Sequence, residues 1–421
     1  MLHQIGLKLR SQMSRFSGEL CKGMRKIQKR FVEEAIYGIQ ARGSVRLSEI
    51  GRSLSESTSL KKRIDRLSRN LGRPGLDCDI SSAVLAQGAV LVKQDSLLIL
   101  DPTDITKKYA KKMELLAKVR DGSEKEIGIG YWVDTVVAAD VDSSEIVPLV
   151  HTLYSQNAVD FMSENRELLN VMERVYAATN SRGVFVIDRG GDRGVLYDGL
   201  LNKEAPFRFI IRQRGDRLLL DGSRLRLTLE LAETCKTPYQ EMVIKEKDGK
   251  EKTYLIHYGF RRVRLPSHPD QPLWLVVVKG LGNKPLMLLT TESMRRNRSV
   301  VWWVVKAYLT RWRVEETIRF IKQSYNLEDI RVLTYQRLKN MAALVLAACF
   351  FAAVHLGHKP KLEILAIHAI IAAERIFGIP DFRYYAIADG IKEILNKSGH
   401  GTIRQKKEDR GCDSQLSFCL T

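Results

Sequence analysis

Hydrophobic residues near the N-terminus recur at the three- and four-residue spacing of helices that bury one face. The pattern predicts a basic helical lead-in followed by three helices, over about 1–30, 32–40, 46–54 and 59–71. In the helix over 46–54, Leu47, Ile50 and Leu54 share one face. The sequence "GRPG" that follows Leu71 predicts the end of the last helix and a linker.

From about residue 96 the pattern changes to short apolar runs bounded by turn-forming residues, which is typical of strands. Five runs predict strands, over 96–101, 128–141, 145–155, 183–188 and 207–215. We expect the second and third to be antiparallel neighbours. A helix over 164–180 carries an apolar stripe of Leu168, Val171, Met172 and Val175, and a short helix follows Asp188. The order strand, two strands, helix, strand, helix, strand is that of a ribonuclease H-like α/β core.

The rest of the chain alternates apolar and polar residues as far as residue 298 and is helical in pattern beyond it. The sequence therefore predicts an N-terminal all-α domain and an α/β, ribonuclease H-like core that is interrupted by a β-rich insertion. The expected parts are a basic helical domain, the first part of the core, the insertion, the completion of the core and a disordered tail, over 1–80, 90–214, 215–298, 299–396 and 397–421.

Charge is concentrated at the N-terminus of a strongly basic chain. The formal net charge is +19, and residues 1–75 contain 17 Lys or Arg against 6 Asp or Glu. The helix over 59–71 carries Lys61, Lys62, Arg63, Arg66 and Arg69. A short helix, a tight turn and a basic helix favour a helix-turn-helix-like domain that reads double-stranded DNA in the major groove. The alternative is a basic helical bundle without a groove partner.

Cysteine usage and hydropathy bear on the compartment. The six cysteines form no CxxC pair and have no histidine at zinc-ligand spacing, so we interpret them as reduced thiols with no zinc site. The N-terminus has charged residues where a signal peptide has an apolar run. The apolar stretch from Met341 is too short for a membrane span and predicts a buried helix. We expect a cytoplasmic protein with no membrane partner.

Two aspartates have the same context, since Asp101 and Asp188 each follow an apolar strand, in "LLILD" and "VFVID". Acids at the carboxyl ends of strands in an open α/β sheet lie where such sheets bind ligands. An aspartate there also often begins a turn or caps a helix, and that alternative stays open for each. We interpret the nearby Asp104 as a turn residue and Asp192 as a helix N-cap. Asp134, within a strand, is a weaker candidate.

A third acid, Glu315, lies in a predicted helix together with Tyr308, Arg311 and Lys322. At about 100° per residue, these four positions lie within about a 60° arc of one helix. Such a stripe suits a phosphate backbone beside a metal-binding acid, although charged residues at this spacing usually form a solvated, ion-paired face. Three carboxylates on one surface repel each other unless divalent cations neutralise them. We therefore expect two Mg²⁺ ions held by Asp101, Asp188 and Glu315.

These residues resemble those of the DDE transposases of bacterial insertion sequences, in the subgroup with the signature Y-x2-R-x3-E-x6-K. The signature is met by Tyr308, Arg311, Glu315 and Lys322, and the contexts of Asp101 and Asp188 look like those of the first two catalytic aspartates. The resemblance covers about residues 96–340. It implies that the three acids are catalytic and hold two Mg²⁺ ions, for which Mn²⁺ can substitute. It also implies that Tyr308, Arg311 and Lys322 bind phosphates near the cut.

The resemblance further implies a cut-and-paste enzyme that binds the terminal inverted repeats of its own element. Water first cleaves the element's end, and the freed 3′-OH then attacks other phosphates, through a hairpin intermediate and in strand transfer to target DNA. A homodimer on paired DNA ends is expected, associated with the bacterial nucleoid. Two alternatives stay open, namely a transposase-derived DNA-binding protein without catalysis and a ribonuclease H-like host nuclease.

Overall fold

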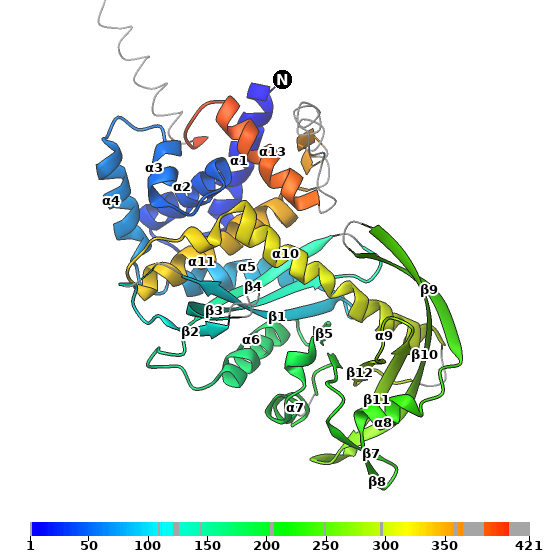
Figure 1. The fold of residues 1–421 in the computed structure, drawn as a ribbon. Helices are drawn as coiled ribbons and strands as arrows, with labels where there is room; N and C mark the ends of the chain where they lie inside the picture. The colour runs from blue at the N-terminus through cyan, green and yellow to red at the C-terminus, as the bar shows by residue number, and fades with distance from the viewer. Residues whose placement is uncertain are drawn as a thin grey trace, which may run out of the picture.

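The computed structural model describes a mixed α/β chain with a helical N-terminal part and one large mixed sheet (Figure 1). It describes residues 2–403 apart from 108–109, 111, 121–125, 144, 203–205, 248–249, 295–297, 358–359, 362 and 365–382.

The N-terminal part consists of α1 (Leu2–Leu20), α2 (Lys26–Arg42), α3 (Leu47–Ser53), α4 (Leu60–Leu71) and α5 (Leu76–Ala89). The three predicted helices are confirmed as α2, α3 and α4. The turn between α3 and α4 covers residues 54–59 and is longer than the tight turn that was expected. Instead of a linker after α4, the chain turns at Gly75, in the left-handed region with φ 76°, and enters α5. We did not predict α5, which buries Ile80 and Val84.

Five strands form the centre of the sheet: β1 (Leu97–Thr106), β3 (Ile127–Ala139), β4 (Ile146–Tyr154), β5 (Val184–Ile187) and β6 (Phe209–Arg212). Their order is β4-β3-β1-β5-β6, with β1 antiparallel to β3 and parallel to β5. β3 and β4 are antiparallel, as predicted, and β5 and β6 are parallel. A short strand that we did not predict, β2 (Ala117–Arg120), pairs with the start of β3.

Alternate residues of β1 point into two cores on opposite faces of the sheet. Leu98 and Leu100 pack with α6 (Glu164–Ala178) and α7 (Gly194–Leu201), and the predicted stripe of α6 is buried there. Leu97 and Ile99 belong to the larger core on the other face, which contains residues of α5, α10 and α11. Figure 1 shows α6 and α7 on one side of the sheet and α5, α10 and α11 on the other.

The predicted insertion contains strands that extend the same sheet. The elements are β7 (Leu218–Asp221), β8 (Arg224–Leu227), α8 (Thr228–Glu233), β9 (Tyr239–Lys247), β10 (Lys250–Leu265), β11 (His268–Lys279) and β12 (Leu286–Thr290). β12 pairs antiparallel with β6, so the insertion is continuous with the central strands. The alternating pattern of this region predicted strands, but only residues 224–227 of the run "RLRLTLELAE" form one, β8, and α8 begins directly after the extended N-cap Leu227.

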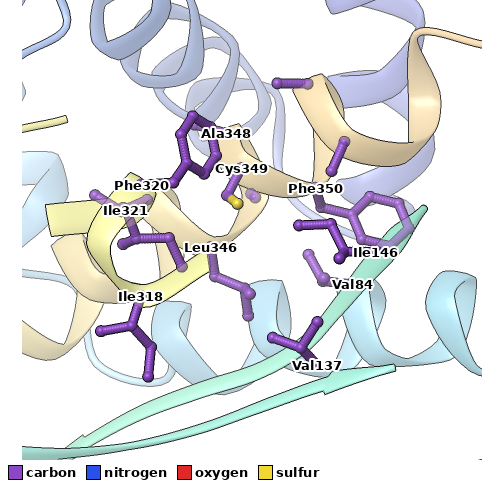
Figure 2. Packing of buried hydrophobic residues seen from close by; sticks show 14 of the residues in the cluster. Val84, Val137, Ile146, Ile318, Phe320, Ile321, Leu346, Ala348, Cys349 and Phe350 are labelled. Carbon is purple, nitrogen blue, oxygen red and sulfur yellow. The ribbon is translucent and has the colours of Figure 1, made fainter. Parts of the chain in front are cut away.

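The last elements are α9 (Arg298–Thr310), α10 (Trp312–Ser324), the 3₁₀ helix η2 (Leu327–Asp329), α11 (Tyr335–Phe350), the π-helix η3 (Phe351–His355) and α13 (Arg383–Lys397). The single helix expected to carry Tyr308 and Glu315 is two helices, since a turn at Arg311 separates α9 from α10. Figure 2 shows Ile318 and Phe320 of α10 and Leu346 of α11 in the larger core, with Val137 of β3.

The apolar helix from Tyr335 to His355 could span a membrane by length and composition alone, yet 83% of its most apolar window is buried inside the protein. It is the core helix that the sequence predicted. Disorder from residue 397 onward was expected, but Ser398 and Thr402 are buried. The reason is Arg10 of α1, whose guanidinium donates to Ser398 Oγ at 2.8 Å and to the Gly401 carbonyl at 2.9 Å. Residues 404–421 lie outside the described residues.

Candidate active site

Asp101 and Asp188 are neighbours in the sheet. The parallel ladder between β1 and β5 ends with Leu100 opposite Ile187, and each aspartate is the next residue of its strand or loop. β1 was expected to end at Asp101, but it continues to Thr106 because β3 pairs with its whole length. Past Leu100, β1 is paired on one side only, and such edge positions tolerate a proline such as Pro102.

Asp188 also begins a turn, which is the alternative role that its sequence context left open. Its Oδ1 accepts a hydrogen bond from the Gly190 backbone N–H at 2.6 Å, at the start of the 3₁₀ turn Arg189–Gly191. That bond holds the carboxylate beside the end of β5. Capping and ligand binding are compatible, because a carboxylate has two oxygens and about four acceptor sites.

Asp104 and Asp192, the aspartates near the two candidates, do not have the roles that the sequence predicted. Asp104 is not a turn residue; it lies in β1, is buried, and accepts from Thr106 Oγ1 at 2.6 Å. Asp192 is not the N-cap of α7, which is Arg193. Its carboxylate instead accepts from the Arg214 backbone N–H at 2.9 Å and pairs with the Arg217 guanidinium. Asp192 thus fastens the loop after β6 to the loop after β5.

Arg311 links the acid of the strand to the acid of the helix. Its Nη2 is 2.6 Å from Glu315 Oε1, and its Nη1 is 3.8 Å from Asp101 Oδ1. Glu315 lies in the first turn of α10, where the helix dipole favours a negative charge. The Arg311 side chain is only 9% exposed, whereas those of Asp101 and Glu315 are 22% and 32% exposed. The two acids therefore face solvent around a buried cation.

The electrostatics of Asp101 depend on the same group of residues. Burial raises the pKa of the Asp101 carboxyl to about 7, and the negative charges of Asp188 and Glu315 act in the same direction. The positive charges of Arg311 and Lys322 lower that pKa. The structure therefore brings all three predicted acids and two of the predicted cations into one electrostatic neighbourhood.

The other two members of the predicted stripe are less exposed than a solvated helix face would be. Tyr308 is buried, its ring centroid lies 5.8 Å from the Arg311 guanidinium carbon, and its hydroxyl has no hydrogen-bond partner within the described part of the chain. Lys322 Nζ is 3.4 Å from Glu328 Oε1. Each predicted cation of the stripe is thus paired with an acid of the site.

A cavity of about 650 Å³, here called the site cavity, opens beside the partly exposed Asp101 and Glu315. It is lined by Asp101, Glu315, Ile318, Arg319, Lys322, Gln323, Asn326, Glu328 and Asp329. The residues around η2 were not predicted, and their position depends on distant contacts. One is Lys107, whose buried ammonium donates to the carbonyls of Glu328 and Ile330. Burial lowers the pKa of Lys107 to about 8.

Comparison with known proteins gives one family. Residues 93–351, which contain both aspartates, the glutamate and the inserted strands, match the family model described as the transposase DDE domain. The chain belongs to this family. Membership implies a polynucleotidyl transferase of DNA transposition, and such transposases typically use divalent metal ions.

The chain was also compared with curated proteins and with solved structures. A search of curated proteins found no match. Among solved structures, the chain is similar to a piggyBac transposase, seen by cryo-electron microscopy in a synaptic complex with hairpin DNA. The TM-score is 0.44 at 12% identity, over 94% of this chain and 80% of that chain.

The three acids of this DDE transposase have the donor chemistry that Mg²⁺ prefers. Within the described ranges, however, no three His, Cys, Asp or Glu side chains are already grouped so as to hold a metal ion. In this structure Oε1 of the Glu315 carboxylate is paired with a cation of the protein, Arg311. For all three acids to share an ion, their carboxylates have to move closer together than they are here.

Asp134, the weaker candidate, lies outside this group. It pairs in register with Pro102, while Asp101 pairs with Thr135, so its side chain points to the opposite face of the sheet. It is fully buried, neither oxygen has a hydrogen-bond partner within the described residues, and burial raises the pKa of Asp134 well above its usual value.

The predicted DNA-binding residues of α4 divide into two sets. Lys61, Lys62 and Arg69 are exposed. Arg63 is directed inward and donates to the carbonyls of Gly51 and Leu54, at 2.8 and 2.7 Å. Arg66 pairs with Glu34 at 2.5 Å and with Glu56 at 2.7 Å. Sequence reasoning missed this division because both acids and both carbonyls belong to other elements.

Proposed function

We propose that this DDE transposase cleaves and joins DNA at the terminal inverted repeats of an insertion sequence, by cut-and-paste transposition. The observation that carries the proposal is the register of Leu100 with Ile187, which makes Asp101 and Asp188 neighbours, together with Arg311, which joins Asp101 to Glu315. Three acids from distant parts of the chain thereby share one electrostatic neighbourhood, and two of them, Asp101 and Glu315, line the site cavity.

The proposal includes the subgroup with the Y-x2-R-x3-E-x6-K signature and a ribonuclease H-like core. The order β4-β3-β1-β5-β6, with three antiparallel strands followed by two parallel ones, supports that core. The strands between β6 and α9 support the insertion that precedes the glutamate helix. The packing of Tyr308 against Arg311, and of Arg311 against Glu315, supports a shared role of the signature residues.

Asp101, Asp188 and Glu315 would hold the divalent metal ions. Bound there, two such ions lower the pKa of an attacking water or hydroxyl and stabilise the leaving oxygen. The chain itself supplies position and charge, which are the main requirements of phosphoryl transfer. If Glu315 bound a metal instead of Arg311, the Arg311 guanidinium would be available to bind a phosphate. Lys322 adds a second cation at the wall of the site cavity.

The exposed cations of α4 suit DNA outside the cut. Lys61, Lys62 and Arg69 face solvent, so they are available for phosphates or bases of the terminal repeat. A homodimer on paired ends belongs to the same proposal, since transposition joins two ends. The non-catalytic alternative is disfavoured by the presence of all three acids. The host-nuclease alternative is disfavoured by the separate basic helices of the N-terminal part.

The test uses purified protein, Mg²⁺ and a duplex with the inverted repeat that flanks the coding sequence. We expect nicking at the repeat's end, and a loss of at least about 10³-fold in Asp101→Asn, Asp188→Asn and Glu315→Gln, since removal of a metal ligand removes that stabilisation. Asp142→Asn, at an exposed acid paired with Lys306, is the matched control and should nick normally. Wild-type nicking by all three variants would refute the proposal.

A further inference from the structure

The site cavity is also lined by two adjacent acids, each paired with a cation of another element. Glu328 pairs with Lys322 at 3.4 Å, and Asp329 pairs with Arg46 Nη2 at 2.7 Å. Both acids belong to η2 and line the cavity. A predicted phosphate-binding lysine and an arginine from the N-terminal helices are therefore held by the same short segment.

The backbone near Arg46 is held against the end of α10 by the contacts of Gly43. It lies between α2 and α3, three residues after Gly43, whose carbonyl accepts from Asn326 Nδ2 at 2.9 Å. Gly43 has φ 57°, and a Cβ there would lie 2.9 Å from the Ser324 carbonyl oxygen, so this approach to the end of α10 requires a glycine. The α2–α3 connection is thereby pressed against the wall of the site cavity.

The guanidinium of Arg46 has unused binding capacity. It has five N–H donors, and in the described part of the chain its side chain makes one hydrogen bond, to Asp329 Oδ2. Its Nε is buried without a partner. The pair is also accessible, because the side chains of Arg46 and Asp329 are 37% and 44% exposed. Exposed ion pairs of this kind are weak, so another anion can displace the carboxylate.

We propose that Arg46 binds a backbone phosphate of the DNA strand that leaves the site cavity, and that Asp329 occupies Arg46 until DNA arrives. The inference rests on the proposed function and adds an N-terminal residue to the DNA path beside the catalytic helix. A phosphate offers Arg46 two oxygens, which suit the planar guanidinium as well as a carboxylate does. Asp329 then acts as an internal competitor, so removing its charge favours DNA.

The experiment measures the affinity of metal-free protein, in EDTA, for a fluorescent duplex carrying the flanking inverted repeat, over a series of salt concentrations. We expect Arg46→Gln to weaken binding and to reduce the slope of log K against log salt by about 0.9, the loss of one phosphate contact. Asp329→Asn should tighten binding about two- to fivefold, the range of one exposed ion pair. In an Arg46→Gln background, Asp329→Asn should have no effect.

The matched control is Arg15→Gln, which removes one positive charge from an exposed Arg15–Glu19 pair on α1. If Arg46→Gln changes the slope no more than Arg15→Gln does, or if Asp329→Asn weakens binding, the inference is wrong. A protein that binds the repeat through Arg46 but does not nick it refutes only the proposed function. If the protein nicks the repeat but Arg46→Gln leaves affinity and salt slope unchanged, only this inference is refuted. If the protein binds no DNA, both are refuted.

Discussion

Leu100 lies opposite Ile187 in the last pair of the parallel β1–β5 ladder, and this relationship places Asp101 next to Asp188. The register of the ladder alone brings these two residues together, because each directly follows a member of the last pair. Glu315 reaches the same place from α10 through Arg311. The relative positions of the three acids thus depend on the pairing of β1 with β5 and on the ion pair between Arg311 and Glu315.

Metal affinity should rise with pH through about 7. Burial raises the pKa of Asp101 to about 7, so below that pH a proton competes with the metal for its carboxylate. We expect the affinity for Mn²⁺, measured by titration calorimetry, to fall by up to about tenfold per pH unit below 7. In Asp101→Asn the dependence in this range should largely vanish. Equal wild-type affinities at pH 6 and pH 8 would contradict the assignment of Asp101.

The same carboxyl should make metal-free stability depend on pH. An unfolded aspartate has a pKa of about 3.9, whereas the pKa of Asp101 in the folded chain is about 7, so the folded chain binds the extra proton between these values. The stabilisation is full below about pH 4 and is lost as the pH rises through 7. The measurement is urea denaturation in EDTA. The free energy of unfolding of Asp101→Asn, relative to that of wild type, should increase as the pH rises from about 4 to about 7. A constant difference would exclude the raised pKa.

Lys322 should contribute one phosphate contact to DNA binding. We expect Lys322→Gln to slow end cleavage and to lower the salt slope of repeat binding by about one, because one counterion-releasing contact is lost. The control is Lys306→Gln, at a cation that pairs with exposed Asp142. If Lys322→Gln and wild type have the same salt slope of repeat binding, Lys322 is only an ion-pair partner of Glu328 and does not contact a phosphate.

Asp192 should matter for stability and not for metal binding. Its buried carboxylate holds the Arg214 backbone N–H and the Arg217 guanidinium, so Asp192→Ala leaves both without their acceptor. We expect a loss of about 1–3 kcal/mol in the free energy of unfolding. Mn²⁺ affinity in the protein that remains folded should be normal. A loss of metal binding without a loss of stability would mean that Asp192, and not Asp188, is the ligand.

The central strands could be predicted because apolar runs such as "LLILD" and "VFVID" are local signals. The turn at Arg311 could not, since the helical spacing of Tyr308, Arg311 and Glu315 continues across a one-residue interruption. The extension of β1 past Asp101 depends on pairing with β3, and the inward direction of Arg66 depends on Glu34 and Glu56. Those partners are distant in sequence, so no local pattern reports them.

The most direct test is anomalous diffraction from crystals of the chain with repeat DNA and Mn²⁺. The account predicts two manganese peaks about 3.5–4 Å apart, within ligand distance of the Asp101, Asp188 and Glu315 carboxylates. It also predicts that Glu315 has left Arg311 and that Arg311 contacts a phosphate. Manganese bound elsewhere, with Glu315 still paired to Arg311 beside the DNA, would contradict it.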